Sequence, residues 1–291
     1  MIGAGARAYV PKSESTDVIL SAIHRTARNG HSPGRPRRAR SGPLPDRRQE
    51  QRSRVERALR TGGVVSTFRP IVDLDTGSVA GVEAHPNVAV LPQRSFDAWV
   101  GDAEAVGLTT ELELTALRTS LASLPSIPDD VFLEVEMSPP TLSVPRLRRL
   151  ITAARAPRLV LAISELDHPD ADTASALAPL RERGVRLAFR DVGTDVAGLG
   201  RLAALAPDFV RLDHALTDGV EHDELKHALV AAVVSWAGDH GAAVVAGHVS
   251  GRAQAEELQA LGVRLVQEEI GPPLHRSDLV AGALHRRDGP S

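Results

Sequence analysis

The sequence lacks cysteine altogether and has few aromatic residues, at 3%. With no cysteine among 291 residues, disulfide bonds, thiolate metal sites and cysteine nucleophiles are all excluded. No apolar run reaches the roughly 18 residues that a membrane-spanning helix needs. The first ten residues also lack the basic segment and long apolar core of a signal peptide. These absences predict a cytoplasmic protein that does not insert into a membrane.

Lysine is almost absent too, so arginine carries nearly all of the positive charge. Only Lys12 and Lys226 are lysines. Residues 31–60 hold ten arginines against three acidic residues, whereas the whole chain has a net charge of −3. This run is rich in Pro, Gly and Ser and has no interleaved aromatic residues. We therefore interpret residues 31–54 as a basic Pro/Arg-rich linker, and nucleic acid is not an expected partner.

The segment before this linker has the pattern of one strand and one helix. Ala8-Tyr9-Val10 is the predicted strand, and residues 17–28 carry apolar side chains at helical spacing. Two elements of this length cannot bury a core of their own. Residues 1–30 are therefore expected to be a piece of a larger domain.

From residue 55 onward, strand-like runs alternate with amphipathic helical segments. The first two strands are joined by a tight turn at Asp75-Thr76-Gly77, which predicts a hairpin, and helical crossovers join most of the others. Eight strands connected in this way predict an α/β fold, a TIM-like β/α barrel with one antiparallel strand, over residues 55–285. The predicted strands are 64–74, 79–85, 131–137, 158–164, 185–190, 208–213, 242–249 and 263–267. The predicted helices include 96–106, 111–124, 145–155, 172–183 and 224–240.

Polar and charged residues gather where these predicted strands end. In such barrels, chemistry takes place at the C-terminal ends of the parallel strands. The sequence LAFRDVGTD (187–195) is the informative one, because an apolar strand ends there in Arg190-Asp191 and a glycine turn. An acidic pair would suit a divalent metal ion, but here one member is a cation. The other strand ends carry Glu83 and His85, Glu136, Glu165, Arg211 and Asp213, His248, and Gln267.

The order of motifs over residues 55–275 resembles the EAL domain, a family of cyclic di-GMP phosphodiesterases. FRPIVDLDTGSVAGVEA is similar to the family's QPIVDL-x-TG-x-IxGxEAL opening, and LEVEMSPPTL is similar to its VNLSP segment. LRERGVRLAFRDVGTD resembles LRxxGxxLAxDDFGTG, LAPDFVRLD resembles LPxDxIKID, and VVAGHVSGRAQAEELQALGVRLVQ resembles the AEGVE segment with its late glutamine. The resemblance implies the barrel fold and hydrolysis of a phosphodiester with two Mg²⁺ or Mn²⁺ ions.

Several positions that the resemblance assigns to the site hold other residues. The retained residues are Glu83 and Asp191 as metal-ligand types, Glu165 as the brace of a loop, and Gln267. The altered positions are Glu136 for the family asparagine, Arg190 for the first aspartate of the DD pair, and Arg211 for the lysine of the KID segment, whose aspartate is Asp213. Ala162 and Gly247 stand where the family has glutamates.

The positive charge of Arg190 decides whether the two metal ions implied by the resemblance can bind. Arginine stays protonated in proteins, and a +1 charge about 4 Å from a +2 ion costs roughly 8 kcal/mol at an effective dielectric constant near 20. The two-metal site is therefore not expected to assemble, and no metal cofactor is expected. We predict instead that Arg190 pairs with Glu136, Asp191 or Glu83 across the barrel mouth. A new metal site built on Glu83 and His85 stays open as an alternative.

The N-terminal segment has a resemblance of its own. GARAYVPKSESTDVILSAIHRTARNG resembles the last strand and helix of a response-regulator receiver domain, with Lys12 at the position of that family's strand-end lysine. The phosphoacceptor aspartate and the earlier strands are absent. We expect the rest of a receiver domain upstream of Met1, with a decayed remnant as the alternative.

Together these patterns predict a catalytically inactive EAL-type module with a regulatory or protein-interaction role in cyclic di-GMP or two-component signalling. Its partner would be a signalling protein that the sequence does not name. The first alternative is a cyclic di-GMP receptor without hydrolysis, with Arg69, Arg190 and Arg211 as phosphate contacts. The second is a weak phosphodiesterase, which alone would require Mg²⁺ or Mn²⁺. A homodimer stays open, because the family's dimer region after the fifth strand differs here.

Overall fold

The computed structural model of the chain describes residues 47–60, 62–152, 155–164, 171–193, 198–268 and 274–280, all in one unit that spans residues 46–291. The strand and helix predicted in residues 1–30, most of the predicted linker, and Glu165 lie outside the described residues. Among the described residues, no helix is both long and apolar enough to cross a membrane.

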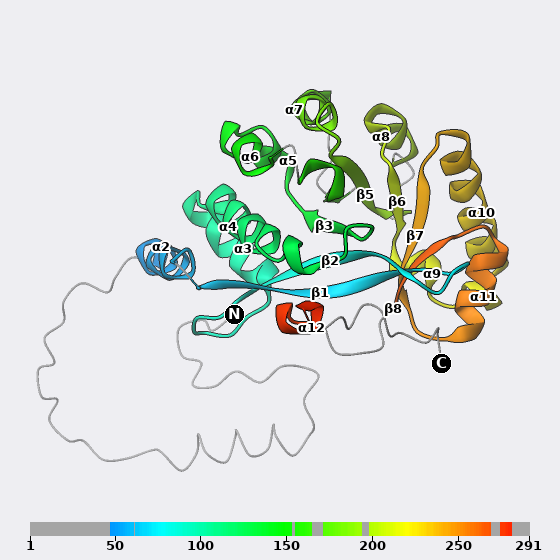
Figure 1. The fold of residues 1–291 in the computed structure, drawn as a ribbon, viewed down its shortest axis with the longest axis horizontal. Coiled ribbons are helices and arrows are strands. Elements are labelled where there is room, and N and C mark those ends of the chain that lie inside the picture. The colour runs from blue at the N-terminus through cyan, green and yellow to red at the C-terminus, as the bar shows by residue number, and fades with distance from the viewer. Residues whose placement is uncertain are drawn as a thin grey trace, which may run out of the picture. The chain divides into compact units, whose positions relative to one another are not determined.

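Within the described residues, eight strands close into a barrel in sequence order (Figure 1). The first strand runs antiparallel to both of its neighbours, whereas all other neighbouring pairs are parallel. The predicted α/β barrel with one antiparallel strand is therefore confirmed. The strands are β1 (Val64–Asp73), β2 (Val79–Val88), β3 (Phe132–Glu136), β4 (Leu159–Ser164), β5 (Arg186–Val192), β6 (Phe209–Leu212), β7 (Ala243–Val249) and β8 (Leu265–Glu268).

Helices connect most of the strands and lie around the barrel (Figure 1). The helix over 96–106 has its predicted bounds, whereas the one predicted over 145–155 ends at Leu150, because Ile151 turns to an extended conformation. The helices are α3 (Phe96–Val106), α4 (Thr109–Leu121), α5 (Pro139–Leu142), α6 (Pro145–Leu150), α7 (Ala171–Arg181), α8 (Gly198–Leu205), α9 (His214–Thr217), α10 (Glu224–Asp239), α11 (Arg252–Ala260) and α12 (Arg276–Val280). Short 3-10 turns are η1 (Leu124–Ser126), η2 (Ala156–Arg158) and η4 (Val220–His222).

One further helix, α2 (Arg47–Ala58), overlaps the segment that the sequence suggested as linker. Its surface is almost entirely polar, so the apolar pattern is too sparse to predict a helix. Two buried side chains, Val55 and Ala58, pack in a small core with Trp99 of α3. Arg54 Nη1 also lies 3.1 Å from Asp102 Oδ2 of α3. Residues 47–54 are therefore helical, in contrast to the linker expected there.

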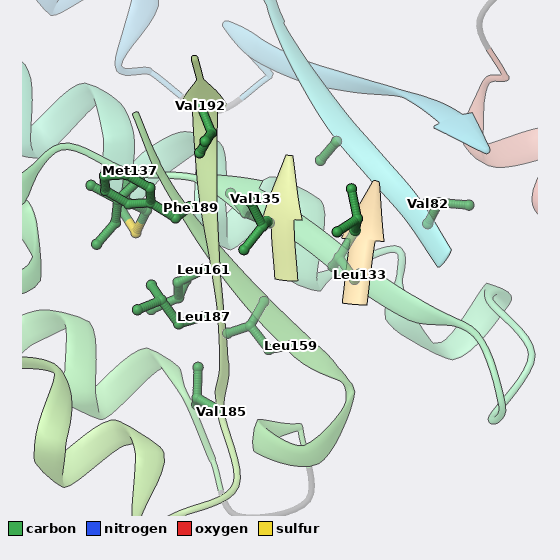
Figure 2. Packing of buried hydrophobic residues seen from close by; sticks show 14 of the residues in the cluster. Val82, Leu133, Val135, Met137, Leu159, Leu161, Val185, Leu187, Phe189 and Val192 are labelled. Carbon is green, nitrogen blue, oxygen red and sulfur yellow. The ribbon is translucent and has the colours of Figure 1, made fainter. Parts of the chain in front are cut away.

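The main hydrophobic core lies between the outer faces of the strands and the helices. Side chains alternate between the two faces of a strand, so every second residue of the central strands belongs to this core. Figure 2 shows the packing around β3, β4 and β5. The labelled residues are Val82, Leu133, Val135, Met137, Leu159, Leu161, Val185, Leu187, Phe189 and Val192.

The inside of the barrel is apolar near the N-terminal ends of the parallel strands. The rings of Phe132 and Phe209 lie 5.0 Å apart, and the guanidinium group of Arg186 lies 5.0 and 5.2 Å from their centroids. Gly81 leaves room for Phe132, since a Cβ at position 81 would lie 2.3 Å from ring atoms. The layer consists of Ile71, Phe132, Val160, Ala162, Ala188, Phe209, Val245 and Leu265. It fills this end of the barrel and leaves the opposite end to polar side chains.

Candidate functional site

Charged and amide side chains from five strands meet inside the barrel at the C-terminal ends of the parallel strands. Because residues two apart share a face, Glu134 and Glu136 point inward from β3 while their apolar neighbours face the helices. The strand register sets Glu83 of β2 beside Glu134. These residues, termed the mouth network, are Glu83, Glu134, Glu136, Arg190, Arg211 and Gln267.

Arg190 of β5 bridges two carboxylates from other strands. Its Nη1 donates to Glu83 Oε1 at 2.6 Å and to Glu136 Oε2 at 2.8 Å. Burial disfavours the charge of Arg190, but the attraction of Glu83 and then of Glu136 outweighs it, so the pKa of Arg190 is raised. The guanidinium group therefore stays charged. The pairing of Arg190 with Glu83 and Glu136 that the sequence suggested is confirmed.

Arg211 of β6 makes a second bridge, deeper in the barrel. Its Nη1 donates to Glu134 Oε1 at 2.8 Å, and its Nη2 donates to Glu83 Oε2 at 3.1 Å and to Gln267 Oε1. Gln267 Nε2 in turn donates to Glu83 Oε2 at 2.6 Å. Arg211 and its partners are all buried. Glu83 is thus the centre of the network, held by both arginines and by the glutamine.

The two innermost carboxylates differ in their electrostatics. Burial alone would raise the pKa of Glu83, but Arg211 and then Arg190 outweigh it and hold this pKa well below its usual value. Burial raises the pKa of Glu134, and the nearby charge of Glu83 adds to this effect against the attraction of Arg211. Glu83 is therefore the firmly ionised member of the pair.

His85 and Glu113 extend the polar region beside the mouth network. His85 Nε2 lies 3.0 Å from Glu83 Oε2. Glu113 of α4 accepts hydrogen bonds from Ser138 Oγ at 2.8 Å and from Ser138 N at 3.4 Å. These side chains line a pocket of about 230 Å³ that also includes Glu136. The pocket is acidic and leads to the carboxylates that Arg190 binds.

Asp191 lies next to Arg190 in sequence but turns to a different partner. Its backbone φ is 60°, which few non-glycine residues adopt. Asp191 Oδ2 accepts a hydrogen bond from Ser164 Oγ of β4 at 2.5 Å. Asp191 therefore faces the end of β4. The same strand carries Ala162, at the position where the resemblance implies a glutamate.

The remaining residues expected at the site are placed in different ways. Arg69 of β1 stands opposite Glu83 in the strand register. Asp213 is the N-cap of α9, because its Oδ1 accepts from Ala215 N at 2.7 Å. The ring of His248 lies 5.3 Å from the ring of His214. Within the described part of the chain, no group of three or more His, Cys, Asp or Glu side chains is arranged to hold a metal ion.

Two members of the site were not expected from the sequence, Glu134 and Glu113. For Glu134 a signal exists, because a glutamate stands in the middle of the apolar run Val131-Phe132-Leu133-Glu134-Val135. A charge at such a position is either exposed or paired inside a barrel. Glu113 gives no such signal, since α4 carries several polar residues and only the fold brings Glu113 to Ser138.

Gly247 lies next to Arg211 of the mouth network. A Cβ at position 247 would lie 3.5 Å from Arg211 Nε. The side chain of Arg211 therefore passes over the position where the resemblance implies a glutamate. The two altered positions fit each other, since the longer arginine lies against the residue without a side chain.

Comparison with known families identifies this barrel. A model of the EAL domain matches residues 52–267. The chain belongs to the EAL domain family. The family membership inferred from the sequence motifs is therefore confirmed.

Curated relatives of this EAL domain are distant and longer. "Uncharacterized protein sll1895" of Synechocystis is 24% identical over 246 residues, which is 78% of this chain and 35% of the relative. "Probable cyclic di-GMP phosphodiesterase PdeI" of Escherichia coli is 24% identical over 185 residues, which is 57% of this chain and 23% of the relative. This chain thus spans about a third or less of the length of these two proteins.

Solved EAL structures share the barrel. The EAL domain of Xanthomonas citri FimX in complex with c-diGMP superposes with a TM-score of 0.71 at 19% identity, over 79% of this chain and 95% of that one. Klebsiella pneumoniae BlrP1, in a manganese/cy-diGMP complex, gives a TM-score of 0.64 at 23% identity, over 74% of this chain and 57% of that one. These similarities establish the fold.

Proposed function

We propose that this EAL domain is a catalytically inactive signalling module with a regulatory or protein-interaction role. The observation that carries the proposal is the bridge from Arg190 Nη1 to Glu83 at 2.6 Å and Glu136 at 2.8 Å. A protein cation lies between the carboxylates that a divalent ion would need.

The electrostatic cost of placing a metal ion beside Arg190 supports this proposal. A +1 charge about 4 Å from a +2 ion costs roughly 8 kcal/mol at an effective dielectric constant near 20. Removing one partner of a buried ion pair costs about 3–5 kcal/mol, because the other charge is left without compensation. A metal ion would therefore have to displace Arg190 and Arg211 from Glu83 and leave both cations nearby. The residues present do not fit the two-metal centre that the family resemblance implies.

The position of Ala162 adds to this argument. In the strand register Ala162 lies beside Glu136 of β3, and it is fully buried without any oxygen donor. Gly247 likewise contributes no side chain. The site therefore has an additional cation and fewer ligands, and both differences oppose binding of Mg²⁺ or Mn²⁺.

A hydrolysis assay tests the proposal. The full chain is incubated with cyclic di-GMP and Mn²⁺, alongside the restored variant Arg190→Asp/Ala162→Glu/Gly247→Glu. A variant with the same kinds of substitution at exposed positions in or directly after helices, Arg57→Asp/Ala122→Glu/Gly101→Glu, is the control. We expect no turnover by the wild-type protein. Multiple turnovers by the wild-type protein at about 1 s⁻¹, an ordinary rate for enzymes, would show that the protein is a phosphodiesterase and would overturn the proposal.

A cyclic di-GMP receptor without hydrolysis is the second candidate, because neighbours such as the FimX EAL domain were solved with this nucleotide. The mouth network weighs against it. Arg190 and Arg211 both bind carboxylates, and three glutamates face these two arginines. The two phosphates of the ligand would meet an excess of negative charge, with Arg69 as the nearest expected contact.

Calorimetric titration of the full chain with cyclic di-GMP separates the two candidates. We expect no binding heat with or without Mn²⁺. Binding that needs no metal and is lost in Arg69→Ala would establish a receptor instead. Under either candidate we propose that the protein acts in the cytoplasm with a signalling protein as its partner.

A further inference from the structure

A groove on the outside of the barrel lies away from the mouth network. It runs between α4 and α6 and reaches Leu59, the residue that directly follows α2; the three helices are labelled in Figure 1. Its volume is about 380 Å³. The lining residues are Leu59, Glu111, Leu114, Thr115, Arg118, Arg146, Arg149 and Leu150.

The floor of the groove is apolar and recessed. Leu114 of α4 is buried, and Leu59 and Leu150 are half-buried at either side. The three leucines come from three different segments, so the apolar floor is formed only in the folded protein. A concave apolar strip of this kind fits one or two aliphatic side chains of a ligand.

The rim of the groove is positively charged. Arg146 Nη2 donates to Glu111 Oε1 at 2.8 Å, and this hydrogen bond lowers the pKa of Glu111, so that pair is neutral overall. Arg118 and Arg149 are exposed and, within the described part of the chain, have no ion-pair partner. Counting the described residues alone, the groove presents two cations without an ion-pair partner in a chain whose net charge is −3.

We propose that this groove binds an acidic amphipathic segment of a partner protein. Aliphatic side chains of the segment would enter the strip between Leu59, Leu114 and Leu150, and its carboxylates would meet Arg118 and Arg149. Charge complementarity selects an acidic partner, and the apolar floor selects one with aliphatic side chains at helical spacing.

Two other anionic partners fit the groove less well. Single-stranded nucleic acid binds through bases stacked on aromatic side chains, and none of the lining residues is aromatic. A membrane surface requires protruding apolar side chains, whereas the leucines here lie at the bottom of a groove. The inference goes beyond the proposed loss of catalysis and does not depend on it, because none of the mouth residues lines this groove.

Fluorescence anisotropy with designed peptides tests the proposal. The probes are labelled 14-residue peptides with leucine at helical spacing and glutamate at the flanking positions, in three registers. Two control peptides are included: one has the same composition without the helical leucine pattern, and one carries lysine in place of glutamate. Single-stranded DNA and vesicles with about 30% anionic lipid represent the other two classes of partner. The full chain is used throughout.

The binding variant is Arg118→Glu/Arg149→Glu, and its matched control is Lys226→Glu/Arg252→Glu, which changes the net charge equally on α10 and α11. We expect saturable binding of at least one acidic amphipathic register, weakened about tenfold or more in the binding variant and unchanged in the control. Unfolding midpoints of both variants confirm that they are folded. A third variant, Leu150→Ala, should weaken binding without any change of charge.

Three results would overturn the proposal. The first is no binding of any acidic amphipathic register. The second is equal binding of the scrambled peptide, which would reduce the groove to a nonspecific charged surface. The third is binding of DNA or vesicles that depends on Arg118 and Arg149 while the peptides fail, which would assign the groove to a different class of ligand. None of these results changes the hydrolysis assay, so the two proposals fail separately.

Discussion

Arg190 Nη1 lies 2.6 Å from Glu83 Oε1, and these two residues are 107 positions apart in the sequence. The contact joins β5 to β2 across the inside of the barrel. Glu83 is almost fully buried, so its charge depends on this arginine and on Arg211 for compensation. The stability of the barrel is therefore tied to the residue that opposes a metal site.

Arg190→Ala should destabilise the protein by about 3 kcal/mol. The substitution leaves Glu83 with one neighbouring cation in place of two, and it removes the arginine that pairs with Glu136. Urea unfolding of the full chain measures the change in the free energy of unfolding. Arg252→Ala breaks an exposed pair with Glu256 on one helix and should change it little. Equal stability of Arg190→Ala and wild type would mean that the bridge does not stabilise the barrel.

The two innermost carboxylates should respond to pH in opposite directions. The pKa of Glu83 is lowered in the folded state, so its contribution to stability is present above the ordinary value of 4.5 and is lost as the pH falls below it. The pKa of Glu134 is raised from 4.5, so its ionised form opposes folding at neutral pH, and this opposition disappears as the pH falls through its folded-state value.

Unfolding free energies of Glu83→Gln and Glu134→Gln, measured from pH 7 to pH 3.5, check these signs. The deficit of Glu83→Gln relative to wild type should shrink on acidification. For Glu134→Gln, the stability relative to wild type should be most favourable at neutral pH and should decline as the wild-type carboxyl becomes protonated. Parallel curves for the two variants would contradict the difference between the two environments.

Two glycines offer a test of packing in the barrel. A Cβ at Gly81 would lie 2.3 Å from ring atoms of Phe132, whereas a Cβ at Gly101 of α3 would meet nothing within 4 Å. Gly81→Ala should destabilise the protein by about 1–3 kcal/mol through overpacking. Gly101→Ala should stabilise it by about 0.5–1 kcal/mol, since alanine favours a helix interior. Thermal unfolding of both variants gives the comparison, and destabilisation of similar size in both would rule out the clash as the cause.

The barrel could be predicted from the sequence because most of its strands can be recognised from short stretches of neighbouring residues. Most strands contain an apolar run bounded by turns, and the tight turn after Asp73 predicted the antiparallel pairing of the first two strands. The helix α2 could not be predicted, since only Val55 and Ala58 among its residues are buried, and their burial depends on α3. A polar helix that packs through two side chains has no periodicity to detect.

For the site, the order of motifs predicted most of the residues that meet at the barrel mouth. The positive charge of Arg190 among acidic strand ends predicted that it pairs with carboxylates. The pairing of Arg211 with Glu134 was not predictable, although a glutamate within an apolar strand signals that its charge is either exposed or paired. Glu134 belongs to a strand that is apolar on both sides of it, and only the register with β2 sets it beside Glu83. Asp213 shows the reverse case, because its place in a motif at a strand end suggested the site, whereas it caps α9.

Arg211→Lys tests whether the arginine is needed for its shape as well as its charge. Arg211 uses two nitrogen atoms to reach Glu134 on one side and Glu83 with Gln267 on the other. A single ammonium group cannot cover both sides. We expect a loss of about 2–3 kcal/mol, since hydrogen bonds to buried charged groups are broken, as measured by urea unfolding. Arg264→Lys is the control and should show no comparable loss, because the side chain of Arg264 is exposed where it pairs with Asp73. If Arg211→Lys were as stable as wild type, charge alone would account for this position.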